Sequence, residues 1–217
     1  MSDKMSMEQN IFYVKRNMID LVWKESMLEG INVTYPDTQA ICEGINVPTV
    51  SVRDIVVINN LKYCWQFTLD IIKDYPVSLI YINQINRAVG GSGEVWNAGV
   101  LRISPVNIGG TTWIPEIPAP ETVVADIDEI MQIASATHRA MTMMLYLMRS
   151  QLYNDSNKRT AQLVANKIMI ENGCGIISIP KDCIREFNGL LIDFYETNDS
   201  QDIMDYVYNH CISGMTQ

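Results

Sequence analysis

The sequence predicts an all-α fold, a helical bundle that carries one small β-hairpin. Apolar residues recur at spacings of three and four along most of the chain, which is the spacing of one face of a helix. Short β-prone runs broken by proline and glycine occur in one place only, between Val100 and Ile117. With 217 residues, 47% of them hydrophobic, the chain is long enough for one substantial core and at most one small appendage.

The N-terminal part is predicted to hold a helix and a connecting segment. The helix runs from Ile11 to Glu29, and Gly30 follows it as a natural C′ residue. A short irregular segment comes next. We therefore assign residues 1–50 to an N-terminal helix with its connecting segment and residues 51–217 to a core.

The core is predicted to open with two helices. The first begins at "SVRD", which resembles a capping pair, and its apolar face contains Ile58, Leu61, Trp65 and Leu69. The second, shorter helix lies within "YPVSLIYINQINRAV". The hairpin follows at about residues 99–117, where the Gly109-Gly110 pair and Pro115 suit exposed strands.

Helical periodicity returns after the hairpin. One apolar stripe lies within Met141–Met148 and another within Ala161–Ile168, and a polar loop separates them. We interpret the methionines as flexible core filling. Two last stripes predict two more helices: Phe187, Leu190, Leu191 and Phe194, and then Ile203, Val207 and Cys211.

Charge and cysteine usage exclude several classes of protein. The formal net charge is −9 and no basic run is present, so nucleic acid is not an expected partner. The five cysteines are far apart and lack a C-x-x-C spacing, which argues against a zinc site or a disulfide framework. The most apolar run, Ala140–Met148, is far shorter than the roughly 18 residues of a bilayer span, so we expect no membrane contact and a cytoplasmic location.

The polar loop, "SQLYNDSNKRT", carries the chemistry. Where a loop leads into a helix, free backbone N–H groups and the helix dipole favour an anion such as phosphate. Arg159 adds a fork of donors for phosphate oxygens, and Asp155 supplies a ligand for magnesium. On spacing alone, a surface ion pair between Asp155 and Arg159 around an ordinary helix cap is the favoured explanation.

The order of these residues resembles the signature of the Fic family, H-x-F-x-[DE]-G-N-[GK]-R. Tyr153 stands at the aromatic position, and Asp155, Asn157, Lys158 and Arg159 match. "AGVLRISPVNIGGTTWIPEIP" resembles the flap of that family, a hairpin over the active site, and "ESMLEG" resembles its inhibitory helix. The resemblance therefore implies a Fic-like helical bundle.

The resemblance also implies a reaction, the transfer of AMP from ATP to a hydroxyl of a target protein. Asp155 would bind Mg²⁺, Asn157 the α-phosphate and Arg159 the outer phosphates. Ser156, Lys158 and Gln162 complete the expected nucleotide site. The flap residues expected to dock the target protein are Arg102, Val106, Ile108 and Thr112, and the expected inhibitory residues are Glu29 and Ser26.

Three positions depart from the family pattern. Gln151 stands where the family has its catalytic histidine, and an amide cannot remove a proton from the attacking hydroxyl. Ser156 replaces the glycine of the loop, where a left-handed backbone is expected. Gln162 replaces the second arginine of many AMP-transferring members, which is the arginine that the inhibitory glutamate, here Glu29, would bind.

These departures leave alternatives open. The chain is either a weakened Mg²⁺-dependent adenylyltransferase or a catalytically silent Fic-like module that binds a nucleotide or a protein strand. The stretch "DSNKR" without a second arginine also resembles the Doc toxins, which transfer the γ-phosphate and would make the chain a protein kinase. A protein that only recruits a partner through the flap is a further alternative. The helix face within Ile55–Leu69 suits either the core or a homo-oligomer.

Overall fold

The computed structural model describes residues 4–91 and 96–214. In these residues it contains ten α-helices, one short 3₁₀ helix and a two-stranded antiparallel sheet, which confirms the predicted all-α fold. Within the same residues, no helix is both long enough and apolar enough to pass through a lipid bilayer. The helices are α1 (Met7–Arg16), α2 (Met18–Leu28), α3 (Tyr35–Cys42), α4 (Val52–Asp70), α5 (Leu79–Val89), α6 (Pro120–Met131), α7 (Ala136–Ser150), α8 (Asn157–Glu171), α9 (Ile184–Thr197) and α10 (Gln201–His210), with the 3₁₀ helix at Lys181–Cys183.

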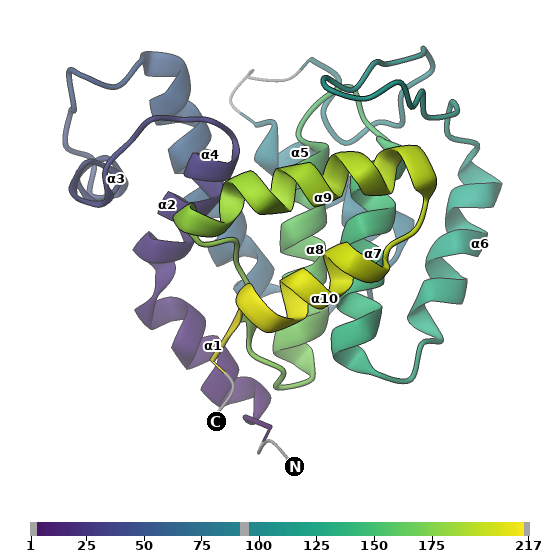
Figure 1. The fold of residues 1–217 in the computed structure, drawn as a ribbon. Coiled ribbons are helices and arrows are strands. Elements are labelled where there is room, and N and C mark those ends of the chain that lie inside the picture. Colours follow the sequence, from purple (N-terminus) through teal and green to yellow (C-terminus); the bar gives the residue numbers. More distant parts are fainter. Residues whose placement is uncertain (1–3, 92–95, 215–217) are drawn as a thin grey trace.

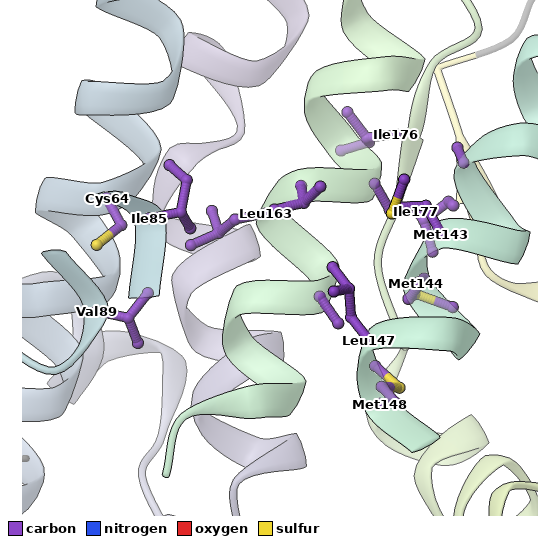
Figure 2. Close-up of a cluster of buried hydrophobic side chains, with 14 of the residues drawn as sticks. Cys64, Ile85, Val89, Met143, Met144, Leu147, Met148, Leu163, Ile176 and Ile177 are labelled. Carbon is purple, nitrogen blue, oxygen red and sulfur yellow. The ribbon is translucent and has the colours of Figure 1, made fainter. Parts of the chain in front are cut away.

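Helix α8 forms the centre of the bundle. It lies between α4 and α5 on one side and α7 on the other, while α9 and α10 cross in front (Figure 1). Figure 2 shows Leu163 of α8 facing Ile85 and Val89 of α5, with the methionines of α7 on the opposite side. Met143, Met144 and Met148 of α7 are fully buried, so the expected role of methionines as core filling is confirmed.

The N-terminal segment differs from the prediction in two places. A single helix from Ile11 to Glu29 is wrong, because Asn17 interrupts it. At Asn17 the backbone leaves the helical conformation, with φ of −105° and ψ of 12°, so α1 ends and α2 begins there. The segment expected to be irregular contains α3, whose N-cap Thr34 accepts from the N–H of Asp37 and whose first turn contains a proline.

Two predicted helix boundaries are confirmed. The Ser51 hydroxyl accepts a hydrogen bond from the N–H of Asp54, so "SVRD" does start a helix, α4. Gly30 follows α2 with φ of +81°, which is the left-handed conformation of a C′ glycine.

The prediction of a hairpin at residues 99–117 is wrong. The structure describes that segment throughout, and it contains no strand. The paired strands are instead β1 (Ile176–Ile177) and β2 (Ile212–Ser213), with Ile176 opposite Ser213. Pro105 and Pro115 lack the N–H groups of a ladder. The buried guanidinium of Arg102 holds the two arms together instead, by donating to the carbonyls of Ser104, Pro115 and Glu116. We refer to residues 99–117 as the flap.

Candidate active site

The polar loop is a tight connection between α7 and α8, as predicted. Gln151 ends α7 with φ of +46°, and Ser156 precedes α8 with φ of +65°. Both backbones are left-handed, which confirms the conformation expected at Ser156. The Ser156 hydroxyl is buried without a hydrogen-bond partner in the described structure, and no side chain caps α8. The first turn of α8 thus leaves its N–H groups to a ligand.

Two amide side chains fix the shape of this loop. The Asn157 carbonyl oxygen accepts from the N–H of Tyr153 at 3.0 Å, and its NH₂ group donates to the Tyr153 carbonyl and to Oε1 of Gln151. The NH₂ group of Gln151 donates to the carbonyl of Met148 at 2.6 Å. Gln151 therefore caps the C-terminal end of α7 with its NH₂ group and holds the side chain of Asn157 in place with its carbonyl oxygen.

The charged residues of the loop meet the end of α2. Arg159, whose side chain is 4% exposed, places Nε 3.1 Å from Oε2 of Glu29 and a terminal nitrogen 3.6 Å from Asp155. Lys158 lies 3.7 Å from the same glutamate. The structure thus brings together Glu29, Asp155, Lys158 and Arg159, which the sequence analysis placed in two separate motifs.

A second carboxyl group of α2 lies one turn before Glu29. Glu25 is buried and accepts a hydrogen bond from the indole N–H of Trp65 at 3.1 Å. Burial is the main reason that its pKa rises to about 8, and the nearby charge of Glu29 also raises it. Ser26, beside it, is buried and donates its hydroxyl to the carbonyl of Val22, so it does not reach the loop.

A cavity of about 460 Å³ opens over the loop. The loop and the start of α8 form one wall, the flap a second, and α9 a third, while Glu29 closes one end. Its lining residues are Glu29, Asn107, Ile108, Gly109, Gln151, Asn154, Asp155, Ser156, Asn157, Lys158, Asn188, Leu191, Ile192 and Tyr195. A neighbouring cavity of about 440 Å³ lies on α2 and α4 and shares Glu29 and Asp155 with the first. Glu29 therefore stands between two cavities.

The flap is fastened at both ends. Besides its bonds within the flap, Arg102 donates from Nε to the carbonyl of Gln151 at 2.6 Å, which ties the flap to the end of α7. Near the tip, the carboxylate of Glu196 on α9 accepts from the hydroxyls of Thr111 and Thr112 and from the N–H of Thr112. These bonds hold the pKa of Glu196 below its usual value.

Several expected site residues lie elsewhere. Gln162 is fully buried in α8 and lines neither of the two cavities. Val106 and Thr112 are likewise outside the lining, whereas Ile108 belongs to it. The sequence analysis missed the wall from α9. Asn188, Ile192 and Tyr195 recur at four and three, next to the apolar stripe that predicted this helix, and that spacing is the signal that identifies them.

The side chains suit a magnesium nucleotide better than a metal cage. No cluster of three or more histidine, cysteine or acidic side chains is present in the part of the chain that the structure describes. Magnesium commonly takes one or two carboxylates and completes its shell with phosphates and water. Asp155, half exposed and lining the cavity beside the start of α8, fits that single-carboxylate role.

Comparisons with known proteins agree with the fold. No family model matches the chain. The protein adenylyltransferase fic-1 of Caenorhabditis briggsae is 25% identical over 201 residues, which make up 87% of this chain and 39% of that protein. The chain thus spans well under half of that curated relative.

Solved structures match more closely in shape than in sequence. Fic-1 of Caenorhabditis elegans has a TM-score of 0.76 at 22% identity over 91% of this chain and 62% of that one. A Fic domain containing signalling protein of Bacteroides thetaiotaomicron has the same TM-score at 16% identity, covering 93% and 84%. BepC of Bartonella tribocorum with bound AMPPNP has a TM-score of 0.52 at 12% identity, covering 81% and 91%. By its fold, this chain resembles the solved structures of Fic domain proteins.

Proposed function

We propose that the chain is a protein adenylyltransferase, which transfers AMP from ATP to a hydroxyl side chain of a target protein. The observation that carries this proposal is the cavity into which Asp155, Asn157 and Lys158 converge at the start of α8. The name of the Caenorhabditis briggsae relative and the AMPPNP in the BepC structure support it. The hydroxyl oxygen would form a bond to the α-phosphorus, and the bond from that phosphorus to the oxygen bridging it to the β-phosphorus would break. Pyrophosphate would leave, and the hydroxyl proton would pass to water.

The start of α8 would bind the phosphates. Its uncapped N–H groups and the positive end of its dipole favour an anion, and the ammonium of Lys158 adds charge at the cavity wall. Arg159 lies directly behind them with a planar donor fork. Donors fixed in this way stabilise the charge that develops on a transferred phosphoryl group.

Asp155 would hold Mg²⁺ together with the phosphates. The ion, when bound, neutralises negative charge on the phosphate oxygens. Asn157 would orient the α-phosphate. Its amide N–H groups now donate to the Tyr153 carbonyl and to Gln151, so one of these bonds would be exchanged for the bond to the phosphate.

The acceptor side lacks a base. The amide of Gln151 does not titrate near neutral pH, and its NH₂ group is engaged by Met148. His138 and His210 are both outside the cavity lining. Loss of a positioned base lowers a rate by about two to four orders of magnitude. The occupied amide of Gln151 also favours the second candidate function, a silent module that binds a nucleotide without turnover.

Glu29 would act as an inhibitory residue in this proposal. It occupies the end of the cavity and pairs with Arg159 and Lys158, two cations that a bound triphosphate would use. The target protein would lie along the flap next to Ile108. A cytoplasmic location belongs to the same proposal, since ATP is available there and the free cysteines of the chain would stay reduced.

The test uses ATP labelled on the α- or the γ-phosphate, with Mg²⁺ and host lysate, for the natural chain and for Glu29→Gly and Gln151→His variants. Protein label from the α position supports AMP transfer, and label from the γ position alone supports the kinase alternative. Label that appears only with Gln151→His supports the silent module. Absence of label together with absence of ATP binding in calorimetry would contradict both nucleotide hypotheses.

A further inference from the structure

A larger cavity, of about 530 Å³, lies beside the C-terminal half of α7. One face of α6, one face of α7 and the ends of α9 and α10 enclose it. It shares no lining residue with the candidate active site. Cavities of this size are typical of small-molecule sites.

Arg149 supplies the positive charge in the lining of this cavity. Its guanidinium is half-buried, lies 3.6 Å from the ring centre of Trp113 in the flap, and faces Phe194 of α9 at 5.9 Å. Its Nε donates to the carbonyl of Tyr195 at 3.2 Å. Its two terminal nitrogens have no hydrogen-bond or ion-pair partner among the described residues. Stacking and the Nε bond therefore fix the plane of the fork and leave its open end for a ligand.

Partial burial makes this charge unfavourable without an anion. Desolvation lowers the pKa of Arg149, and a guanidinium nevertheless stays protonated in proteins. A carboxylate fits its fork through two parallel charge-assisted hydrogen bonds. The cavity thus offers a preformed anion site at one end.

The rest of the lining indicates what kind of ligand would carry the anionic group. Ile130, Leu145 and Met204 give the cavity an apolar wall beyond the arginine. The Thr142 hydroxyl, two helical turns from Arg149, is buried without a partner in the described structure. A ligand with an apolar body covers this wall and recovers the free energy of burial.

Two carboxylates limit the charge of the ligand. Asp126 and Glu129 of α6 also line the cavity, and Asp126 accepts a hydrogen bond from the hydroxyl of Tyr146 at 3.0 Å. Their repulsion disfavours a polyphosphate such as a nucleotide. The geometry points to a second ligand site in this chain, between α6, α7, α9 and α10, that binds a small monoanionic carboxylate with an apolar body through Arg149.

Calorimetry with 3-phenylpropionate tests this site on the full chain. We expect saturable binding that saturating Mg²⁺-ATP does not displace. The neutral 3-phenylpropan-1-ol and the cationic 3-phenylpropylamine have the same apolar body, and we expect each to bind at least about ten-fold more weakly. Equal binding of acid, alcohol and amine, or no acid binding up to about 10 mM, would overturn the proposal.

Variants tie the binding to the cavity. Arg149→Met should weaken the binding of 3-phenylpropionate at least about ten-fold, and Arg149→Lys should retain part of the affinity. Arg185→Met, on the exposed face of α9, is the matched control and should bind like the natural chain. Met204→Trp fills the cavity while keeping the arginine, so it should also abolish binding even where Arg149→Met fails to fold. Acid binding that survives both Arg149→Met and Met204→Trp would show that it occurs elsewhere.

Discussion

Oε2 of Glu29 lies 3.1 Å from Nε of Arg159, so the end of α2 closes the site that the start of α8 opens. The sequence analysis expected Glu29 to lack its arginine, because Gln162 stands at that position. The structure corrects this expectation. Arg159 serves as the partner of Glu29, and Gln162 stays inside the bundle.

Replacement of Glu29 by glutamine should tighten Mg²⁺-ATP binding. The variant frees Arg159 and Lys158 and removes a negative charge from the cavity end, and we expect about a ten-fold lower Kd in calorimetry. Glu43→Gln is the matched control, because Glu43 also caps a helix before a left-handed glycine but is exposed. Equal affinities for the natural chain and Glu29→Gln would exclude an inhibitory role.

Gln151→His should restore a base. We expect label transfer from ATP to rise by about two to four orders of magnitude. Gln151→Ala loses the bonds to the Met148 carbonyl and to the Asn157 amide, each worth about 1 kcal/mol, without gaining a base. Its transfer should therefore not exceed the natural level. A histidine variant no faster than the alanine variant would show that another feature limits the reaction.

Glu25 should make stability fall as the pH rises. The native chain keeps this carboxyl protonated up to its raised pKa of about 8, while the unfolded chain releases the proton near 4.5. The native state therefore binds more protons between these values, and its free energy of unfolding decreases there by at most about 4 kcal/mol. Glu25→Gln keeps an acceptor for the indole N–H of Trp65, and its stability should not decrease in this way with pH. Urea denaturation at pH 5 and pH 8 should show an advantage of the variant that grows with pH; a constant difference would contradict the raised pKa.

Ser156→Gly should stabilise the chain. Glycine removes the left-handed strain of about 1–2 kcal/mol and a buried unpaired hydroxyl, and it adds backbone entropy to the unfolded state. The net gain should be about 0.5–1 kcal/mol in thermal or urea unfolding. Ser156→Ala also removes the hydroxyl but retains the strain, so it should be less stable than Ser156→Gly. Equal stabilities of the two variants would mean that the backbone at this position is relaxed.

Glu196→Gln should loosen the flap. The glutamine keeps one acceptor of the two that hold Thr111 and Thr112, so the protection of the Thr112 amide from hydrogen exchange should drop. Because the pKa of Glu196 is lowered, its contribution is present above the usual value of 4.5 and is lost as the pH falls through the lowered pKa. Asp193→Asn, on the same helix, should leave the exchange unchanged. Unaltered protection in Glu196→Gln would show that Arg102 alone holds the flap.

The sequence predicted most of the helices because their apolar residues repeat at the helical period, which is a local property. It failed at Asn17, where the backbone leaves the helical conformation, and at the flap. The flap has β-prone residues, yet its carbonyls are satisfied by Arg102, and no local pattern shows where the guanidinium of Arg102 will reach. The α9 wall of the cavity was missed for a related reason, since its residues gain their role only by facing the loop.

The sequence by itself determined the all-α class, the loop between α7 and α8 and the absence of a titrating group at Gln151, because each follows from residue type and short-range spacing. The left-handed backbone at Ser156 was expected from the family resemblance. Only the tertiary structure decided that Arg159 is the partner of Glu29, that the amide of Gln151 closes α7, and that Arg149 faces a separate cavity. These outcomes depend on which side chains packing brings together from distant segments, and burial then sets their charges and hydrogen bonds.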